Sequence, residues 1–196
     1  MTQLLKYDLI PFAEYLAGER DAEIRSEYVA GLVYAMAGAS ETHNTIATTL
    51  CALIETQLRA ECRVWQSDMK LAIHHQGQDF AYYPDIMAAC GENAEDSYTR
   101  RNPILIVEVL SASTERVDLK EKFDNYTSVP SLLEYVVVSQ DVPLVRVFRH
   151  RTSWEREVYR ADDVFRLESV ELDVPVQHIY RRVRKEVGLE VSVNPL

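Results

Sequence analysis

Apolar positions along the chain change their spacing several times, and each spacing predicts a different element. Apolar residues recur at helical spacing over residues 42–59, which predicts the longest helix. Residues 103–110 instead form a nearly unbroken apolar run, which is typical of a strand buried on both faces. Shorter alternating or apolar stretches predict further strands at 24–28, 32–37, 63–66, 69–74, 80–90, 134–139, 144–149 and 154–159. Further helices are expected at 11–18, 115–127 and 175–184.

The order of these elements is hairpin, helix, strands, helix, strands. This order predicts an α/β (mixed α+β) fold in which a central mixed β-sheet is flanked by helices. No repeat or linker interrupts the pattern, so the 196 residues are expected to form a single domain over 1–196.

One carboxylate interrupts the apolar run at 103–110. Glu108 would cost several kcal/mol or more to ionise there if it were isolated, so it needs a cation, a metal or a proton. A second acid, Asp85, enters the strand expected over 80–90. Carboxylates on neighbouring strands can approach within about 5 Å when they face the same way. Such a pair offers hard oxygen ligands to Mg²⁺ or Mn²⁺.

A structural interpretation of the same two acids stays open. Asp85 can cap a turn, and Glu108 can pair with an internal cation such as Arg25 or Arg101. In that case the chain is a structural or partner-binding protein, and the two acids hold no metal.

The helix expected at 115–127 places Asp118, Lys122 and Tyr126 on one face. This face can direct the Lys122 ammonium toward the acid-bearing strands, where it would orient a nucleophile and offset charge. The alternative is a surface pair between Asp118 and Lys122 worth about 0.3–0.5 kcal/mol. His43 opens the long helix and can cap it or contact a phosphate, although a role outside the site is the expectation.

Charge is distributed unevenly along the chain. The net charge of −10 argues against a protein that coats nucleic acid non-specifically. Residues 1–99 hold 6 basic and 15 acidic side chains, whereas residues 100–196 hold 15 and 16. A surface for a polyanion is therefore expected in the second half, and the candidates nearest Glu108 in sequence are Arg100, Arg101, Arg116, Lys120 and Lys122.

The cellular compartment is also expected from the sequence. No apolar stretch approaches the roughly 20 residues that span a bilayer, and the first residues lack a signal-peptide pattern. Cys51, Cys62 and Cys90 are odd in number and lack metal-type spacing. They are expected to be reduced cysteines of a cytoplasmic protein.

Several ordered motifs resemble the Uma family of putative restriction endonucleases, within the PD-(D/E)XK nuclease superfamily. An N-terminal pattern is similar as well, and the resemblance spans roughly residues 10–150. The ordered set is specific, whereas each fragment alone is weak. The matching segments are Tyr83-Pro84-Asp85, Ile106-Val107-Glu108-Val109-Leu110-Ser111, Glu121-Lys122-Phe123-Asp124-Asn125-Tyr126, Glu27-Tyr28-Val29-Ala30-Gly31, Met36-Ala37-Gly38 and His43.

The resemblance implies a restriction-endonuclease-like fold and an endonuclease that uses Mg²⁺ (or Mn²⁺) to hydrolyse phosphodiester bonds in DNA. Asp85 and Glu108 would bind the metal, the carbonyl of Val109 would add a backbone ligand, and Glu27 would approach as a further acid. Many nucleases of this kind cut both strands as homodimers, and exposed strands in the C-terminal third leave a homodimer open.

Leu110 departs from the superfamily pattern, which has a lysine at that position. The sequence is similar to members whose lysine has moved to the following helix, which implies Lys122 in that role. Lys120 faces about 200° away on the helix, and Lys70 is a third possibility. The alternative function is a catalytically inactive nucleic-acid- or protein-binding module on a nuclease fold.

Overall fold

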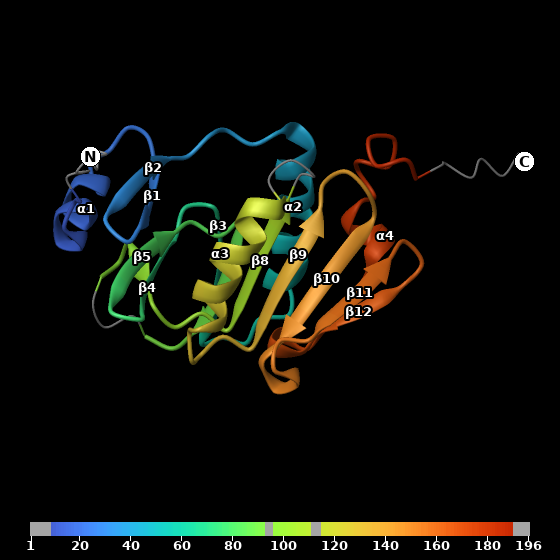
Figure 1. Cartoon of the computed structure of the whole chain (residues 1–196). Coiled ribbons are helices and arrows are strands. Elements are labelled where there is room, and N and C mark those ends of the chain that lie inside the picture. Colours follow the sequence, from blue (N-terminus) through green and yellow to red (C-terminus); the bar gives the residue numbers. More distant parts are fainter. Residues whose placement is uncertain (1–8, 93–95, 111–114, 190–196) are drawn as a thin grey trace, which may run out of the picture.

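The computed structural model describes residues 9–92, 96–110 and 115–189, with the side chains of 115–119 left out. A six-stranded sheet forms the centre of the described structure (Figure 1). Its central pair, β8 and β9, is parallel, and every other neighbouring pair is antiparallel. The strands, in spatial order, are β11 (Arg156–Arg160), β10 (Leu144–Arg149), β9 (Glu134–Ser139), β8 (Leu105–Leu110), β6 (Ile86–Cys90) and β3 (Cys62–Gln66).

Helices cover both faces of β8. On one face, α2 (Glu41–Glu55) packs Ile46, Leu50 and Ile54 against a core that contains Leu105, Val107 and Val109. On the other face, α3 (Glu115–Thr127) contributes Tyr126 to a core that contains Ile106 and Leu110. Figure 1 shows α3 in front of the sheet and α2 behind it. Because successive strand residues alternate between faces, Glu108 lies on the α3 face.

A second, five-stranded sheet has the order β2-β1-β5-β4-β7. Its hairpin turns at Ala30 and Gly31, both at positive φ, as a two-residue type I′ turn requires. A Cβ added to Gly31 would lie 2.9 Å from the side chain of Leu9, so the turn admits only glycine. Its strands are β1 (Ser26–Val29), β2 (Leu32–Ala35), β4 (Lys70–His75), β5 (Gln78–Tyr82) and β7 (Thr99–Arg100), and α1 (Phe12–Glu19) packs on β1.

The prediction of a single strand over 80–90 is wrong. The chain forms β5 in the small sheet, crosses at Tyr83-Pro84-Asp85, and then forms β6 in the large sheet. Pro84 has no N–H to donate to a ladder, which explains why pairing stops there. Asp85 therefore lies just before β6, at the junction of the two sheets.

The C-terminal third also differs from expectation. The helix expected over 175–184 is confined to α4 (Val176–Ile179), followed by turns. Two short paired strands, β12 (Val164–Leu167) and β13 (Leu172–Pro175), precede it. Tyr180, Val183 and Val187 are buried in the core that contains α2, so packing rather than helical spacing explains their apolar pattern.

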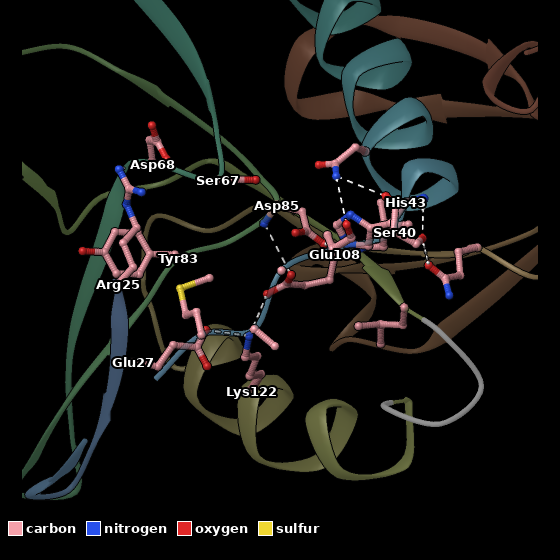
Figure 2. Close-up of a pocket in the computed structure, with 18 residues that line it drawn as sticks. Arg25, Glu27, Ser40, His43, Ser67, Asp68, Tyr83, Asp85, Glu108 and Lys122 are labelled. Carbon is pink, nitrogen blue, oxygen red and sulfur yellow. Dashed lines mark hydrogen bonds and ion pairs between the residues drawn. The ribbon is translucent and has the colours of Figure 1, made fainter. Parts of the chain in front are cut away.

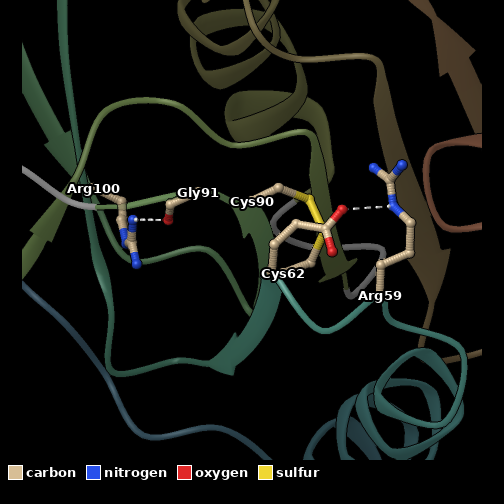
Figure 3. Close-up of a disulfide and its surroundings, with 6 residues drawn as sticks. Arg59, Cys62, Cys90, Gly91 and Arg100 are labelled. Atoms are coloured by element: carbon tan, nitrogen blue, oxygen red, sulfur yellow. Dashed lines mark hydrogen bonds and ion pairs between the residues drawn. A yellow bond between two sulfur atoms is a disulfide. The ribbon is translucent and has the colours of Figure 1, made fainter.

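The expectation of three reduced cysteines is also wrong. Cys62 and Cys90 form a disulfide between β3 and β6 (Figure 3), whereas Cys51 is free. The two residues are direct cross-strand partners with their Cα atoms 3.9 Å apart. Strand register brings them together, and their separation of 28 positions gave no sign of it. Within the described ranges, no helix has both the length and the apolarity that a bilayer crossing needs.

Candidate active site at the junction of the two sheets

Asp85 and Glu108 lie opposite each other across the β6–β8 pair. The register pairs Ile86 with Val107, so the next position sets Asp85 opposite Glu108. The Asp85 backbone N–H points to Glu108 Oε2 at 3.4 Å. Asp85 Oδ2 in turn accepts a 2.7 Å hydrogen bond from the Val109 N–H. The backbone N–H groups of Asp85 and Val109 thus hold the two carboxylates together.

Lys122 and Tyr126 reach Glu108 from α3. The Lys122 ammonium lies 2.8 Å from Glu27 Oε1 and 3.5 Å from Glu108 Oε1. The Tyr126 hydroxyl donates to Glu108 Oε1 at 2.8 Å. The two residues are four positions apart, so they share a helical face. Glu27 comes from β1, and Figure 2 shows Lys122 between it and Glu108.

The environment of Glu108 favours its protonated form. Burial raises the pKa of Glu108 to about 8, against the opposing effects of the Lys122 ammonium and the Tyr126 hydroxyl. The charges of Asp85 and Glu27 raise it further. Only 3% of Glu108 is exposed, so water contributes little. The one lysine that contacts Glu108 is shared with Glu27 and does not offset the effect of burial on Glu108.

His43 belongs to the same group of side chains, contrary to the expectation of a role outside the site. Its Nε2 lies 3.0 Å from Asp85 Oδ2. Burial lowers the pKa of His43, but the hydrogen bond and charge of Asp85, with Glu108 and the Val109 backbone, outweigh burial and raise it. Its buried Nδ1 has no hydrogen-bond partner in the described structure. Ser40, not the His43 side chain, caps α2 by accepting from the His43 N–H at 3.1 Å.

A cavity of about 600 Å³ opens over these residues. Figure 2 shows that its labelled side chains come from both sheets, α2 and α3. Cations and anions line it together, so a charged ligand would meet both signs. The charged residues are Arg25, Glu27, His43, Asp68, Asp85, Glu108 and Lys122.

The donor set suits a hard divalent cation. Asp85 and Glu108 present carboxylate oxygens, and Asp85 Oδ1 accepts no hydrogen bond from the described part of the chain. Within 9–92, 96–110 and 115–189 no three potential side-chain ligands are already gathered for a metal. Proteins usually bind Mg²⁺ through one or two carboxylates and leave its other coordination positions to water and substrate.

Two other lysines could fill the role of the motif lysine, and neither lines the cavity. Lys120 is exposed, and Lys70 is buried against the rings of Tyr15 and Tyr83. Leu110 packs in the core on the α3 face and lines the cavity. The side chain of Asp118 lies outside the described residues, so its pair with Lys122 stays a prediction.

The internal cations proposed for a purely structural Glu108 do not contact it. Arg25 pairs with Asp68 at 3.1 Å, and Arg101 is exposed. The described partners of Glu108 are instead Lys122, Tyr126 and the Asp85 N–H. Sequence reasoning named His43 but did not place it at Asp85, and it missed the hydrogen bond of Tyr126, because only the folded chain brings α2 and α3 to the same strand end.

Known proteins resemble this chain over most of its length. A family model named Uma2, described as "Putative restriction endonuclease", matches residues 12–177. Two uncharacterized proteins of Synechocystis sp. are 33% and 35% identical to it. The first alignment covers 86% of this chain and 90% of the relative, and the second covers 67% and 76%.

A solved structure shares the fold. It is the crystal structure of a putative nuclease belonging to DUF820 from Anabaena variabilis, with a TM-score of 0.71 and 18% sequence identity. The match covers 86% of this chain and 96% of that chain. The expected mixed α+β, nuclease-like fold is therefore confirmed.

Proposed function

The chain belongs to the Uma2 family of putative restriction endonucleases, and from this premise we propose that it is a Mg²⁺- or Mn²⁺-dependent endonuclease that hydrolyses phosphodiester bonds in DNA. The observation that supports this most strongly is the pairing of Asp85 with Glu108 at the wall of an open cavity. Glu108 is buried there with too little positive charge, and a divalent cation is the partner that would allow it to ionise.

Asp85 and Glu108 are the proposed metal ligands, with the Val109 carbonyl as a further candidate. A divalent cation would supply Lewis-acid stabilisation of the charge on the phosphate. The chain itself fixes the ligands: the Val109 N–H and His43 hold Asp85 Oδ2, and Tyr126 holds Glu108 Oε1. Preorganised ligands need no rearrangement when the substrate arrives.

Lys122 is the proposed catalytic cation. Its ammonium is only partly exposed and lines the cavity beside both Glu27 and Glu108. A positive charge there would offset charge that develops on the phosphate and orient the attacking water. Lys122 would thus supply from α3 what Leu110 cannot supply from β8. Glu27 holds the ammonium in place through its 2.8 Å contact.

Cleavage assays on matched variants test this proposal. Plasmid, linear and single-stranded DNA, with RNA alongside, would be incubated with the chain and Mn²⁺ or Mg²⁺. We expect Asp85→Asn, Glu108→Gln and Lys122→Met each to reduce cleavage about 10²–10³-fold. Lys120→Met removes the same charge from an exposed position of the same helix and should leave the rate within about twofold.

Two results would count against the proposal. If Lys122→Met cut DNA as fast as Lys120→Met, the catalytic role of Lys122 would be refuted. A chain that binds Mn²⁺ through Asp85 and Glu108 yet cuts no nucleic acid would instead be the inactive binding module on a nuclease fold.

A further inference from the structure

A second cavity of about 570 Å³ runs along the outer face of α2. The helix contributes Thr45, Thr48 and Ala52, whose spacing of three and four residues places them on one face. The opposite face carries the buried Ile46 and Leu50. Asn44 lines both this cavity and the cavity of the candidate active site, so the two cavities adjoin at the first turn of α2.

Two arginines from the C-terminal region close the other side of this groove. Arg181 and Arg182 line it, and both are exposed. They follow Tyr180 and precede Val183, two residues buried in the core beneath α2. These buried neighbours fix the backbone of the turn and so place the two arginines beside the threonine face.

Three other arginines of the C-terminal third are already engaged by carboxylates. Arg149, Arg151 and Arg166 each pair with a carboxylate. No carboxylate of the described residues pairs with Arg181 or Arg182, although Arg181 contacts the His178 imidazole. Guanidinium groups that pair with no carboxylate retain hydrogen-bond donors for an external anion.

We propose that this groove binds the phosphodiester backbone of the nucleic-acid strand as it leaves the active site, an inference that rests on the proposed nuclease function. Guanidinium, hydroxyl and amide groups are the donors that commonly contact phosphate oxygens. The α2 face from Asn44 to Ala52 is about 12 Å long at 1.5 Å per residue, which matches about three to four nucleotide steps of a duplex strand. Glu41 is the one acid that lines the groove in the described part.

Under this proposal, the second half of the chain contributes Arg181 and Arg182 to the polyanion surface, rather than the arginines nearest Glu108 in sequence. Arg100 lies over the Trp65 ring at 4.7 Å, and neither Arg100 nor Arg101 lines either cavity. Contacts to phosphate are independent of base sequence, so the groove would contribute affinity and register but no sequence specificity.

Binding measurements on a charge-matched pair of double variants test this inference. The binding of a labelled 20-nucleotide duplex would be followed by fluorescence anisotropy over a range of salt concentrations. We expect Arg181→Gln with Arg182→Gln to weaken binding about tenfold and to lower the slope of log affinity against log salt by about 1.8. Arg63→Gln with Arg156→Gln makes the same charge change at exposed positions outside both cavities and should alter affinity less than twofold.

Cleavage separates failure of this inference from failure of the proposed function. We expect the groove variant to raise KM for the duplex and to cut a four-nucleotide substrate at the wild-type rate, because a substrate of that length, once seated in the active site, does not extend along the groove. If both double variants weaken binding equally, the groove is refuted while cleavage by the wild type stands. If the wild type neither binds nor cuts nucleic acid, the proposed function is overturned and the groove with it. Poly-glutamate tests the kind of partner. If it displaced the labelled duplex as effectively as a nucleic-acid competitor does, the groove would instead bind an acidic protein, and the proposal of a phosphodiester site would be overturned.

Discussion

Two glutamates are buried in neighbouring parallel strands of the same sheet, and they have opposite surroundings. Glu108 lies near the end of β8 and Glu134 at the start of β9, with 3% and 1% of their surfaces exposed. The strands are paired in register, with Leu105 opposite Glu134 and Glu108 opposite Val137. The two carboxylates therefore lie toward opposite ends of one strand pair.

Protein groups donate to both carboxylate oxygens of Glu134. Arg149 donates to one carboxylate oxygen at 3.1 Å, and both the N–H and the hydroxyl of Ser169 donate to the other, at 2.7 and 2.6 Å. Arg149 is also buried and is held further by Glu157 and Glu168. A buried acid with a fixed guanidinium and two further donors is a structural element.

Glu108 has a longer ion pair, a lysine shared with Glu27, and a second acid opposite. It also borders a cavity. Burial alone therefore does not distinguish Glu108 from Glu134. The distinguishing feature is incomplete compensation next to space that a ligand can enter.

The largest effect is expected from removing the cation that satisfies Glu134. Arg149→Ala leaves Glu134 buried without its partner and should lower the free energy of unfolding by about 3–5 kcal/mol. Urea denaturation measures this loss. Arg151→Ala, which removes a largely exposed pair with Glu168, should cost no more than about 1 kcal/mol. Equal losses in the two variants would show that Glu134 does not depend on Arg149.

A smaller effect is expected from pH, and it concerns Glu108. Its pKa in the folded, metal-free chain is about 8, above the ordinary value of 4.5. Its contribution to stability is complete below about pH 4.5 and is lost as the pH rises through about 8, because the unfolded carboxyl group releases its proton first. Metal-free wild type should therefore lose a few kcal/mol across this range relative to Glu108→Gln.

Denaturation curves of both proteins between pH 4.5 and 8, with a chelator present, measure this difference. Mn²⁺ should restore the stability of the wild type near pH 8 and leave Glu108→Gln unchanged, since the ion binds the ionised carboxylate. Parallel curves for the two proteins over the whole range would contradict the raised pKa of Glu108.

The smallest effect is expected from removing one hydroxyl donor from each glutamate. Ser169→Ala removes a donor to Glu134 and should cost about 1.5–3 kcal/mol, the usual range for a hydrogen bond to a charged group. Tyr126→Phe removes the donor to Glu108 and should cost less, about 1 kcal/mol at pH 7, because Glu108 can hold a proton instead. Thermal denaturation at pH 7 compares them, and a larger loss for Tyr126→Phe would reverse the assignment of the two sites.

Much of the fold could be predicted from the sequence because local patterns determine it. The apolar run at 103–110 is strand β8, with only Pro103 and Ile104 outside it, and the helical spacing at 42–59 marks α2, which ends at Glu55. The break at Pro84 was missed because β5 and β6 are both apolar, and apolar character does not show which sheet a strand joins. The short C-terminal strands were missed because their burial depends on packing against distant elements.

Part of the candidate site could be predicted from the sequence for the same reason. Asp85, Glu108 and Lys122 stand out locally as an acid beside a proline, an acid in an apolar strand and a lysine at helical spacing from Tyr126. His43 and the pairing of Cys62 with Cys90 depend on which elements become neighbours. Sequence separation contains no direct information about such contacts.

Calorimetric titration with Mn²⁺ tests the central claim most directly, namely that Glu108 is incompletely compensated in order to bind a cation and Glu134 is not. Wild type, Glu108→Gln and Glu134→Gln would be titrated at a temperature at which all three are folded. We expect wild type and Glu134→Gln to bind Mn²⁺ with equal affinity and Glu108→Gln to bind at least about tenfold more weakly. Unchanged Mn²⁺ affinity in Glu108→Gln would contradict the claim.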